Sequence, residues 1–363
     1  MKILITGNMG YVGPGVVTRL RKKFPQATLI GYDMAYFASS LTNVLILPEY
    51  YLDVQLFGDV RKITQDVLEG VDAVIHLAAI SNDPMGSRYE KLTFDVNYKS
   101  SVKLAEMAKA AGASSFVFAS SCSVYGAAGD APKTETSELN PLTAYAKSKV
   151  STELDLEQLA DENFTVTCLR FATACGMSSR LRLDLVLNDF VAGAVTSGQI
   201  NILSDGSPWR PLIHVKDMAR AMEWAVTRNA DNGGEFLAVN TGCKEWNYQV
   251  KEIAEAVIAV IPGTSVMLNK DAAPDKRSYR VNFDLFKQLA PDHQPIYTLQ
   301  QTIRELYEGL IAMNFADAGF RDSLLMRLMV LTRLQESGLL NDDLEWNHKV
   351  KSISSPETIT QTL

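Results

Sequence analysis

Short apolar runs and amphipathic stretches alternate along the first half of this 363-residue chain. The apolar runs, rich in β-branched residues, predict strands at 2–6, 27–33, 54–60, 72–78, 114–121 and 165–173. The stretches between them predict helices at 16–24, 98–112 and 144–160. Strands separated by helices are joined by crossover connections, so they lie parallel in one sheet. The alternation therefore predicts an α/β fold with a doubly wound parallel sheet over residues 1–176.

Beyond residue 176 the pattern changes to short mixed pieces separated by Gly and Pro. They predict helices at 183–197, 216–228 and 246–261, a strand near 200–204, and the apolar runs PLIHV and EFLAVN between them. We expect a smaller mixed α/β lobe over 177–315 that faces the substrate, with segments at about 211–242 returning to complete the first sheet.

Residues 316–340 carry apolar residues at helical spacing, and a polar tail follows them. Residues 316–363 are therefore expected to form a C-terminal helical extension and a tail. Such a helix could pack on its own chain or on a second subunit.

The balance of charged and apolar residues narrows the possible partners. The formal net charge is −7, with 47% hydrophobic and 21% charged residues. Phosphate-rich partners need a basic surface, so we expect no nucleic acid and no membrane partner. No apolar stretch approaches the roughly 18 residues of a spanning helix, and the apolar start is too short for a signal peptide. The four cysteines form no CxxC pair and the four histidines are scattered, so we expect a cytoplasmic protein without a metal site.

The segment ITGNMGYVG places Gly7, Gly10 and Gly13 between the first predicted strand and the first predicted helix. Glycine lets the backbone approach a pyrophosphate, and the start of a helix offers free N–H groups to it. We therefore expect a dinucleotide cradle of the Rossmann type, in which Tyr11 and Val12 also contact the cofactor. The GxxGxxG spacing is also compatible with an ordinary tight turn between a strand and a helix.

A carboxylate ends the second predicted strand. Asp33 stands twenty residues after Gly13, where it can accept hydrogen bonds from the adenosine ribose. YDMAYFASS contains no Arg or Lys to bind a 2′-phosphate, so NAD is favoured over NADP. Ligands of such sheets lie beyond the carboxyl ends of the strands. The crevice is therefore expected to include the strand-end residues Asp59, Val60, Leu77, Ala78 and Ala79.

Tyr145 and Lys149 stand four residues apart in a predicted helix, so their side chains lie on one face. A nearby ammonium and a positively charged nicotinamide would favour the phenolate and bring the pKa of Tyr145 toward neutrality. Such a pair could take the proton of a sugar alcohol while a hydride leaves for NAD. Ser121, at the end of the preceding strand, could hydrogen-bond the reacting hydroxyl. The Tyr-x-x-x-Lys pattern alone is also common on helices without a catalytic role.

With these residues in place, the chain resembles the extended short-chain dehydrogenases/reductases, a class that includes NAD-dependent nucleotide-sugar epimerases, dehydratases and dehydrogenases. The resemblance covers about residues 1–315 and rests on TGNMGYVG, GDV, HLAA, TFDVN, SSCSVYG, YAKSK, LRFATACG, SDGSPWRPLIHVKDMARAM and PDKRSYRV. It implies that Tyr145 is the acid/base, that Ser121 orients the substrate, and that Lys149 binds the nicotinamide ribose and lowers the pKa of the tyrosine. It also implies that Asn97 helps to position this helix and the cofactor, and that the protein is a homodimer.

The resemblance further implies a nucleotide-diphosphate sugar as the substrate. The residues at matching positions are Ser123, Arg182, Asn188, Arg210, Arg277 and Tyr279. Arginine suits such a ligand because its planar guanidinium binds phosphate oxygens in pairs.

Ser121, Cys122 and Ser123 stand where the 4,6-dehydratases of the class have Thr-Asp-Glu. Without that acid pair the removal of water lacks its proton donor, so dehydratase activity is not expected. We expect an NAD-dependent nucleotide-sugar epimerase that oxidises a ring hydroxyl at C4. A sugar-nucleotide 4-dehydrogenase or 4-ketoreductase with net redox turnover is the alternative, and a non-catalytic NAD-binding regulator is a third hypothesis.

Overall fold

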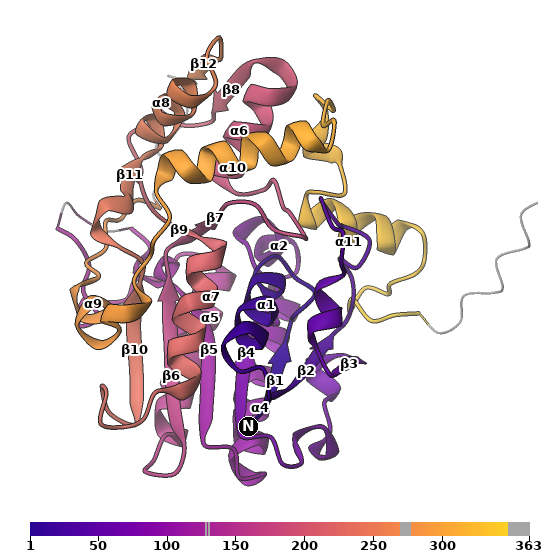
Figure 1. Cartoon of the computed structure of the whole chain (residues 1–363), viewed down its shortest axis with the longest axis vertical. Coiled ribbons are helices and arrows are strands. Elements are labelled where there is room, and N and C mark those ends of the chain that lie inside the picture. The colour runs from indigo at the N-terminus through magenta and orange to yellow at the C-terminus, as the bar shows by residue number, and fades with distance from the viewer. Residues whose placement is uncertain (128, 130, 269–276, 348–363) are drawn as a thin grey trace, which may run out of the picture.

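The structure is a computed structural model that describes residues 1–127, 129, 131–268 and 277–347. Its main feature is a sheet of seven parallel strands in the order β10-β6-β5-β4-β1-β2-β3 (Figure 1). These strands are β1 (Lys2–Thr6), β2 (Thr28–Asp33), β3 (Val54–Phe57), β4 (Ala73–His76), β5 (Ser115–Ser121), β6 (Thr165–Phe171) and β10 (Phe236–Thr241). The strand order reverses between β1 and β4, which pair side by side. The crevice beyond their carboxyl ends is therefore the point at which ligands of such sheets bind.

Helices cover both faces of the large sheet. They are α1 (Gly13–Lys23), α2 (Asp83–Arg88), α3 (Glu90–Phe94), a π-helical turn (Asp95–Lys99), α4 (Ser100–Ala110), α5 (Ala144–Leu159) and α7 (Val215–Thr227). The side chains of β1 divide between the two faces, because Ile3 and Ile5 pack with α1 and α7 whereas Leu4 packs with α4 and α5. All three are fully buried, as a parallel sheet covered on both faces requires. The α/β fold expected from the alternating pattern is confirmed.

A smaller lobe lies above the large sheet in Figure 1. It contains a sheet in the order β11-β9-β7 and the strand pair β12-β8. Its elements are β7 (Thr173–Cys175), α6 (Val186–Ser197), β8 (Gln199–Ile202), β9 (Trp209–His214), β11 (Asn247–Gln249), α8 (Val250–Val260), β12 (Ser265–Leu268) and α10 (Leu299–Ala312), while α9 (Asp284–Leu289) lies next to β10. The lobe has a core of its own, in which Val191, Ile253 and Ile303 join α6, α8 and α10. Every helix that the structure describes is too short or insufficiently apolar to cross a membrane.

The segment at about 211–242 divides between the two parts. β10 joins the large sheet beside β6, and α7 packs on α1, as expected for a returning segment. β9, in contrast, pairs with β7 and β11, so the expectation is wrong for this strand. The reason is that tertiary contacts choose the partner of a strand, and a local apolar pattern does not specify them.

The C-terminal extension folds back on the rest of the chain. The helix expected over 316–340 is shorter, because a 3-10 turn (Phe320–Asp322) precedes α11 (Arg327–Glu336). The Asp317 carboxylate accepts from Gly319 N at 2.8 Å, and such bonds compete with the helical ladder. Leu331 of α11 packs with Ile80 and Met85 of the large domain, so the helix docks on its own chain. The polar tail, 348–363, lies outside the described residues.

Candidate active site

A cavity of about 1120 Å³ lies between the carboxyl ends of the large sheet and the smaller lobe. This volume exceeds that of a typical site for one small ligand, about 300–1,000 Å³, so there is space for a dinucleotide and a substrate together. The predicted site residues all line the cavity except Gly13, Asn97 and Asn188. Those in the lining are Gly7, Gly10, Tyr11, Val12, Asp33, Asp59, Val60, Leu77, Ala78, Ala79, Ser121, Ser123, Tyr145, Lys149, Arg182, Arg210, Arg277 and Tyr279.

The glycine turn between β1 and α1 brings backbone against backbone. Gly7 has a φ of 74°, and a Cβ there would lie 2.5 Å from Ala78 N. A Cβ at Gly13 would lie 2.1 Å from Asn8 O. Real side chains do not tolerate such distances, so the turn is this tight because both residues are glycine. Among the described residues no side chain caps α1, which leaves its first N–H groups for an anion.

Asp33 ends β2 beside this turn. Its carboxylate accepts hydrogen bonds from Met9 N at 3.0 Å and from Ala35 N at 2.7 Å. Burial raises the pKa of Asp33, and these two backbone N–H groups oppose the rise. The turn thus combines N–H donors for a diphosphate with a carboxylate acceptor for ribose hydroxyls, and this set of groups fits NAD.

Asn97 lies behind the cavity, in the π-helical turn before α4, and is fully buried. Its side-chain oxygen accepts from Ile80 N at 2.8 Å, and its amide donates to Ile80 O at 2.9 Å and to Ser148 Oγ at 3.3 Å. These bonds tie the loop after β4 to α5, the helix that carries Tyr145 and Lys149. Asn97 therefore has the geometry of a positioning residue and does not line the cavity itself.

Ser121, Tyr145 and Lys149 meet at the carboxyl end of β5. Ser121 is the last residue of β5, Tyr145 stands in the first turn of α5, and their side chains are hydrogen-bonded. The Lys149 ammonium lies 5.6 Å from the centre of the Tyr145 ring and donates to Ala119 O at 2.7 Å. The ammonium is thus bonded to a backbone carbonyl of β5 and faces the tyrosine ring.

Burial shifts the pKa of both groups. It raises the pKa of Tyr145 to about 12, opposed by the hydrogen bond from Ser121 and the charge of Arg182. It lowers the pKa of Lys149 to about 7, opposed by Glu153. The sequence predicted a lowered pKa for Tyr145, and the structure gives the opposite direction because desolvation of the phenolate outweighs the nearby cation. At neutral pH the phenol in this geometry carries its proton.

A buried ion pair lies behind the lysine. Glu153 and Arg170 meet at 2.6 Å, with side chains only 4% and 6% exposed. Ser120 donates a hydrogen bond to the same carboxylate. The Glu153 charge is the group that raises the pKa of Lys149 most strongly against burial.

The arginines predicted to bind the substrate reach the cavity from different elements. Arg182 is buried, and its Nε lies 2.6 Å from Asp184 Oδ1. Arg277 pairs with Asp83 at 2.6 Å. Arg210 donates to the Arg277 carbonyl, and this bond joins the two predicted diphosphate contacts.

Two polar residues of this region differ in what they offer a ligand. Asn188 is fully buried behind the cavity, and its amide nitrogen donates to Tyr11 Oη at 3.1 Å and to Arg182 O at 2.9 Å. Its side-chain oxygen accepts a hydrogen bond from Gly176 N at 3.0 Å. Because both ends of the amide are bonded within the protein, Asn188 supports the lining residues Tyr11 and Arg182 in place of the predicted contact with the substrate. Ser123 lines the cavity, and its hydroxyl oxygen is buried without a hydrogen-bond partner among the described residues.

The cavity has a further wall that the sequence did not predict. Tyr36 and Phe37 stand three and four residues after Asp33, and Arg327 and Leu344 come from the C-terminal extension. The aromatic pair after a strand-end carboxylate was a usable signal. For Arg327 and Leu344 the sequence offered only an apolar stripe, which does not say where a helix docks.

Comparisons with known proteins agree with this geometry. Residues 3–242 match the NAD dependent epimerase/dehydratase family. The chain is 27% identical to a UDP-glucose 4-epimerase of Corynebacterium glutamicum over 274 residues, 70% of this chain and 79% of that protein. It is 30% identical to a UDP-glucose 4-epimerase of Lactobacillus helveticus over 282 residues, 73% of this chain and 84% of that protein.

Solved structures share the fold at lower identity. TunA, an NAD dependent NDP-hexosamine 5,6-dehydratase involved in tunicamycin biosynthesis, is 23% identical with a TM-score of 0.73, and the match covers 86% of this chain and 98% of TunA. The UDP-glucose-4-epimerase from Stenotrophomonas maltophila, solved with NAD and formylated UDP-arabinopyranose, is 21% identical with a TM-score of 0.73, and the match covers 86% of this chain and 99% of that one. The chain belongs to the NAD dependent epimerase/dehydratase family.

Proposed function

We propose that this protein is an NAD-dependent nucleotide-sugar epimerase that oxidises and re-reduces a ring carbinol at C4. The observation that carries the proposal is the convergence of Ser121, Tyr145 and Lys149 on a cavity that also contains the glycine turn and Asp33. The two relatives described above are named as UDP-glucose 4-epimerases. Their names support a uridine diphosphate sugar as the substrate class.

The cofactor end of the cavity is built from backbone and one carboxylate. NAD, when bound, accepts a hydride from the carbinol carbon and returns it to the opposite face of the resulting ketone. The N–H groups of the glycine turn hold the diphosphate, and Asp33 accepts hydrogen bonds from the adenosine ribose. Lys149, in α5, would bind the second ribose and contributes positive charge near Tyr145.

Tyr145 moves the proton. In the oxidation the carbinol O–H proton passes to the phenolate oxygen, and in the reduction the phenol returns it to the ketone oxygen. Because the pKa of Tyr145 is raised to about 12, the phenol is prepared for the second of these steps. Formation of the phenolate relies on the groups that lower its pKa, which are the Ser121 hydrogen bond and the Arg182 charge. Ser121 is therefore assigned two roles, orienting the carbinol and stabilising the phenolate.

The substrate end of the cavity favours epimerisation over dehydration. Cys122 stands at the position where the 4,6-dehydratases have an acid, and it is 1% exposed. Its thiol donates a hydrogen bond to Arg170 O at 3.0 Å. Its side chain therefore points into the protein interior. Ser123 has a buried hydroxyl without a partner among the described residues, and the guanidinium groups of Arg182, Arg210 and Arg277 suit the substrate diphosphate.

The experiment is a turnover assay on the purified protein without added cofactor. The bound nucleotide is first identified by mass spectrometry after denaturation. UDP-glucose and UDP-N-acetylglucosamine are then each incubated with the protein, and the products are separated by chromatography. The proposal expects a C4 epimer and no net change in absorbance at 340 nm. Growth of that absorbance in proportion to product, with added NAD required, would instead identify a net dehydrogenase.

A further inference from the structure

The C-terminal segment closes one side of the cavity. It comprises α11 and the strap, by which we mean residues 337–347. Arg327 at the start of α11 and Leu344 in the strap both line the cavity. The matches to the two solved structures described above cover 98% and 99% of those structures but 86% of this chain. Part of the chain is therefore additional to the shared fold.

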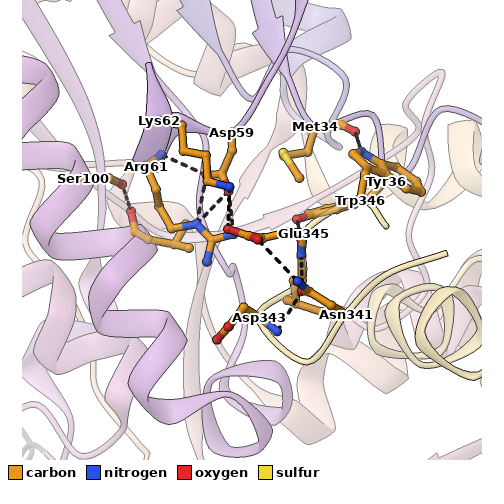
Figure 2. Close-up of polar contacts among 12 residues, drawn as sticks. Met34, Tyr36, Asp59, Arg61, Lys62, Ser100, Asn341, Asp343, Glu345 and Trp346 are labelled. Carbon is orange, nitrogen blue, oxygen red and sulfur yellow. Dashed lines mark hydrogen bonds and ion pairs between the residues drawn. The ribbon is translucent and has the colours of Figure 1, made fainter. Parts of the chain in front are cut away.

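A set of contacts, which we call the latch, ties the strap to the large domain (Figure 2). The latch consists of Trp346 Nε1 donating to Met34 O at 2.7 Å, the Tyr36 hydroxyl donating to Leu344 O, and Glu345 paired with Lys62 at 2.7 Å. Met34 directly follows Asp33, the predicted acceptor of the adenosine ribose, and Tyr36 stands three residues after it. The strap therefore lies over the adenosine end of the crevice.

Arg327, at the start of α11, is buried with an unused donor. The residue is 1% exposed, and its guanidinium carbon lies 4.3 Å from the centre of the Phe37 ring. Nη2 donates to Arg180 O at 2.7 Å. Nη1 is buried and has no partner among the residues that the structure describes. A buried guanidinium N–H group without a partner is costly unless a ligand completes it.

The carboxylates that pair with the neighbouring arginines are not bonded to Arg327. Arg180 pairs with Glu49 at 2.8 Å, and Arg182 pairs with Asp184 at 2.6 Å. Both carboxylates are therefore already taken by other arginines. Burial, together with the charges of Arg182 and Arg180, lowers the pKa of Arg327 to about 9, and Asp184 opposes this shift. At neutral pH the guanidinium is still protonated, and no ion pair joins it to a carboxylate among the residues that the structure describes.

We propose that Arg327 binds the diphosphate of a nucleotide in the cavity, and that this nucleotide is the dinucleotide cofactor. The C-terminal segment is then part of the cofactor site and not only a packed appendage. The inference rests on the proposed function, because it requires that the cavity hold a dinucleotide. A diphosphate matches the guanidinium in charge and in geometry, since two of its oxygens can accept from one planar donor set.

The sugar nucleotide also carries a diphosphate, so the position of Arg327 decides between the two. Its guanidinium packs on Phe37, four residues after Asp33. It also interacts electrostatically with Tyr11, which belongs to the glycine turn. Phe37 and Tyr11 belong to the cofactor end of the cavity, whereas Arg182, whose charge also acts on Arg327, is a predicted substrate contact. The direct packing on Phe37 favours the cofactor end. The predicted substrate contacts Arg210 and Arg277, in contrast, are joined to each other and to Asp83.

The test measures nucleotide affinity by calorimetry on the full-length protein after removal of bound cofactor. The variant is Arg327→Gln, and the matched control is Arg333→Gln, which changes an exposed arginine on the same helix. The titrants are NAD, ADP, adenosine and UDP. We expect the affinity of Arg327→Gln for NAD and ADP to fall roughly 10- to 100-fold, the usual range for losing a hydrogen bond to a charged group. Its affinity for adenosine and UDP, and all affinities of Arg333→Gln, should stay unchanged.

Each other outcome has a definite meaning. Equal losses for adenosine and ADP would mean that Arg327 only shapes the pocket, and a loss confined to UDP would assign it to the substrate; either result overturns the inference. Arg327→Lys, which keeps a charge but not the planar donor set, should lie between the wild type and Arg327→Gln, and it serves as the test if circular dichroism shows Arg327→Gln to be unfolded. If the wild type binds NAD and ADP and Arg327→Gln binds them with the same affinity, this inference alone fails. If the wild type binds neither, the proposed function fails with it.

Discussion

The buried pair of Glu153 and Arg170 allows stability and chemistry to be separated by mutation. Removing the charge with Glu153→Gln leaves the Arg170 guanidinium buried and unpaired. Breaking a buried ion pair in this way costs about 3–5 kcal/mol, a large share of the roughly 5–15 kcal/mol by which a domain is stable. Because the same carboxylate raises the pKa of Lys149, the variant should also lower that pKa from its value of about 7.

The control for burial is Asp161→Asn. Asp161 and Lys109 also meet at 2.6 Å, but their side chains are 42% and 36% exposed, so we expect a change in stability too small to resolve. Urea unfolding followed by far-ultraviolet circular dichroism should show a midpoint lowered by roughly 1–2 M for Glu153→Gln and an unchanged one for Asp161→Asn. The double variant Glu153→Gln/Arg170→Met removes the orphaned cation and should recover most of the loss.

The pH profile supplies the second readout. If the reaction requires the ammonium of Lys149, activity falls as the pH rises through the pKa of Lys149. The double variant should lose activity at lower pH than the wild type, although the stability of the double variant has recovered. Our reasoning would be refuted if Glu153→Gln unfolded at the same urea concentration as Asp161→Asn. It would also be refuted if the double variant recovered stability and kept the wild-type pH profile.

Three further predictions concern the tyrosine, the lysine and the latch. Tyr145→Phe should lower turnover by about 10²–10⁴-fold while calorimetry shows unchanged NAD affinity; an equal loss of binding would mean that Tyr145 supports the cofactor instead. The pKa of Lys149 is about 7 in the folded protein, below the ordinary value of 10.5, so the unfolded chain binds more protons between these values. The stability of the wild type relative to Lys149→Met should therefore rise from pH 7 to about 9.5. A difference in urea unfolding that does not change with pH would contradict the buried environment. Lys62 holds the pKa of the Glu345 carboxyl below its usual range, so the latch is intact at neutral pH and is lost on acidification through that lowered pKa. The hydrogen-exchange protection of residues 337–347, relative to the intrinsic exchange rate at each pH, should then fall in the wild type and be low at all pH values in Glu345→Gln.

Much of the fold could be predicted from the sequence because the large sheet is built from local patterns. The runs that gave β1, β2, β4, β5 and β6 are continuous and apolar, as strands buried on both faces must be. The partner of β9 could not be predicted, since its pairing with β7 and β11 depends on tertiary contacts outside the run itself. The helix expected over 316–340 was too long because side chains such as Asp317 bond to the backbone and compete with helical hydrogen bonds.

The candidate site could be predicted where residue type and spacing carry the chemistry. Gly7, Asp33 and the pair Tyr145 and Lys149 follow that rule, and the cavity brings them together. The direction of the Tyr145 pKa could not be predicted, because it depends on how deeply the phenol is buried and on the distance to each cation. Arg327 could not be predicted either, because a guanidinium from the C-terminal helix reaches the cavity only through the docking of that helix.

The central claim is that a resident NAD and Tyr145 carry a ring carbinol to the ketone and back. Its most direct test is epimerisation of a uridine diphosphate sugar deuterated at C4, by purified protein without added cofactor. We predict that the C4 epimer forms with the deuterium retained at C4, because the hydride that leaves returns to the same carbon. Product that has lost the deuterium, or accumulation of reduced cofactor in proportion to product, would contradict the account.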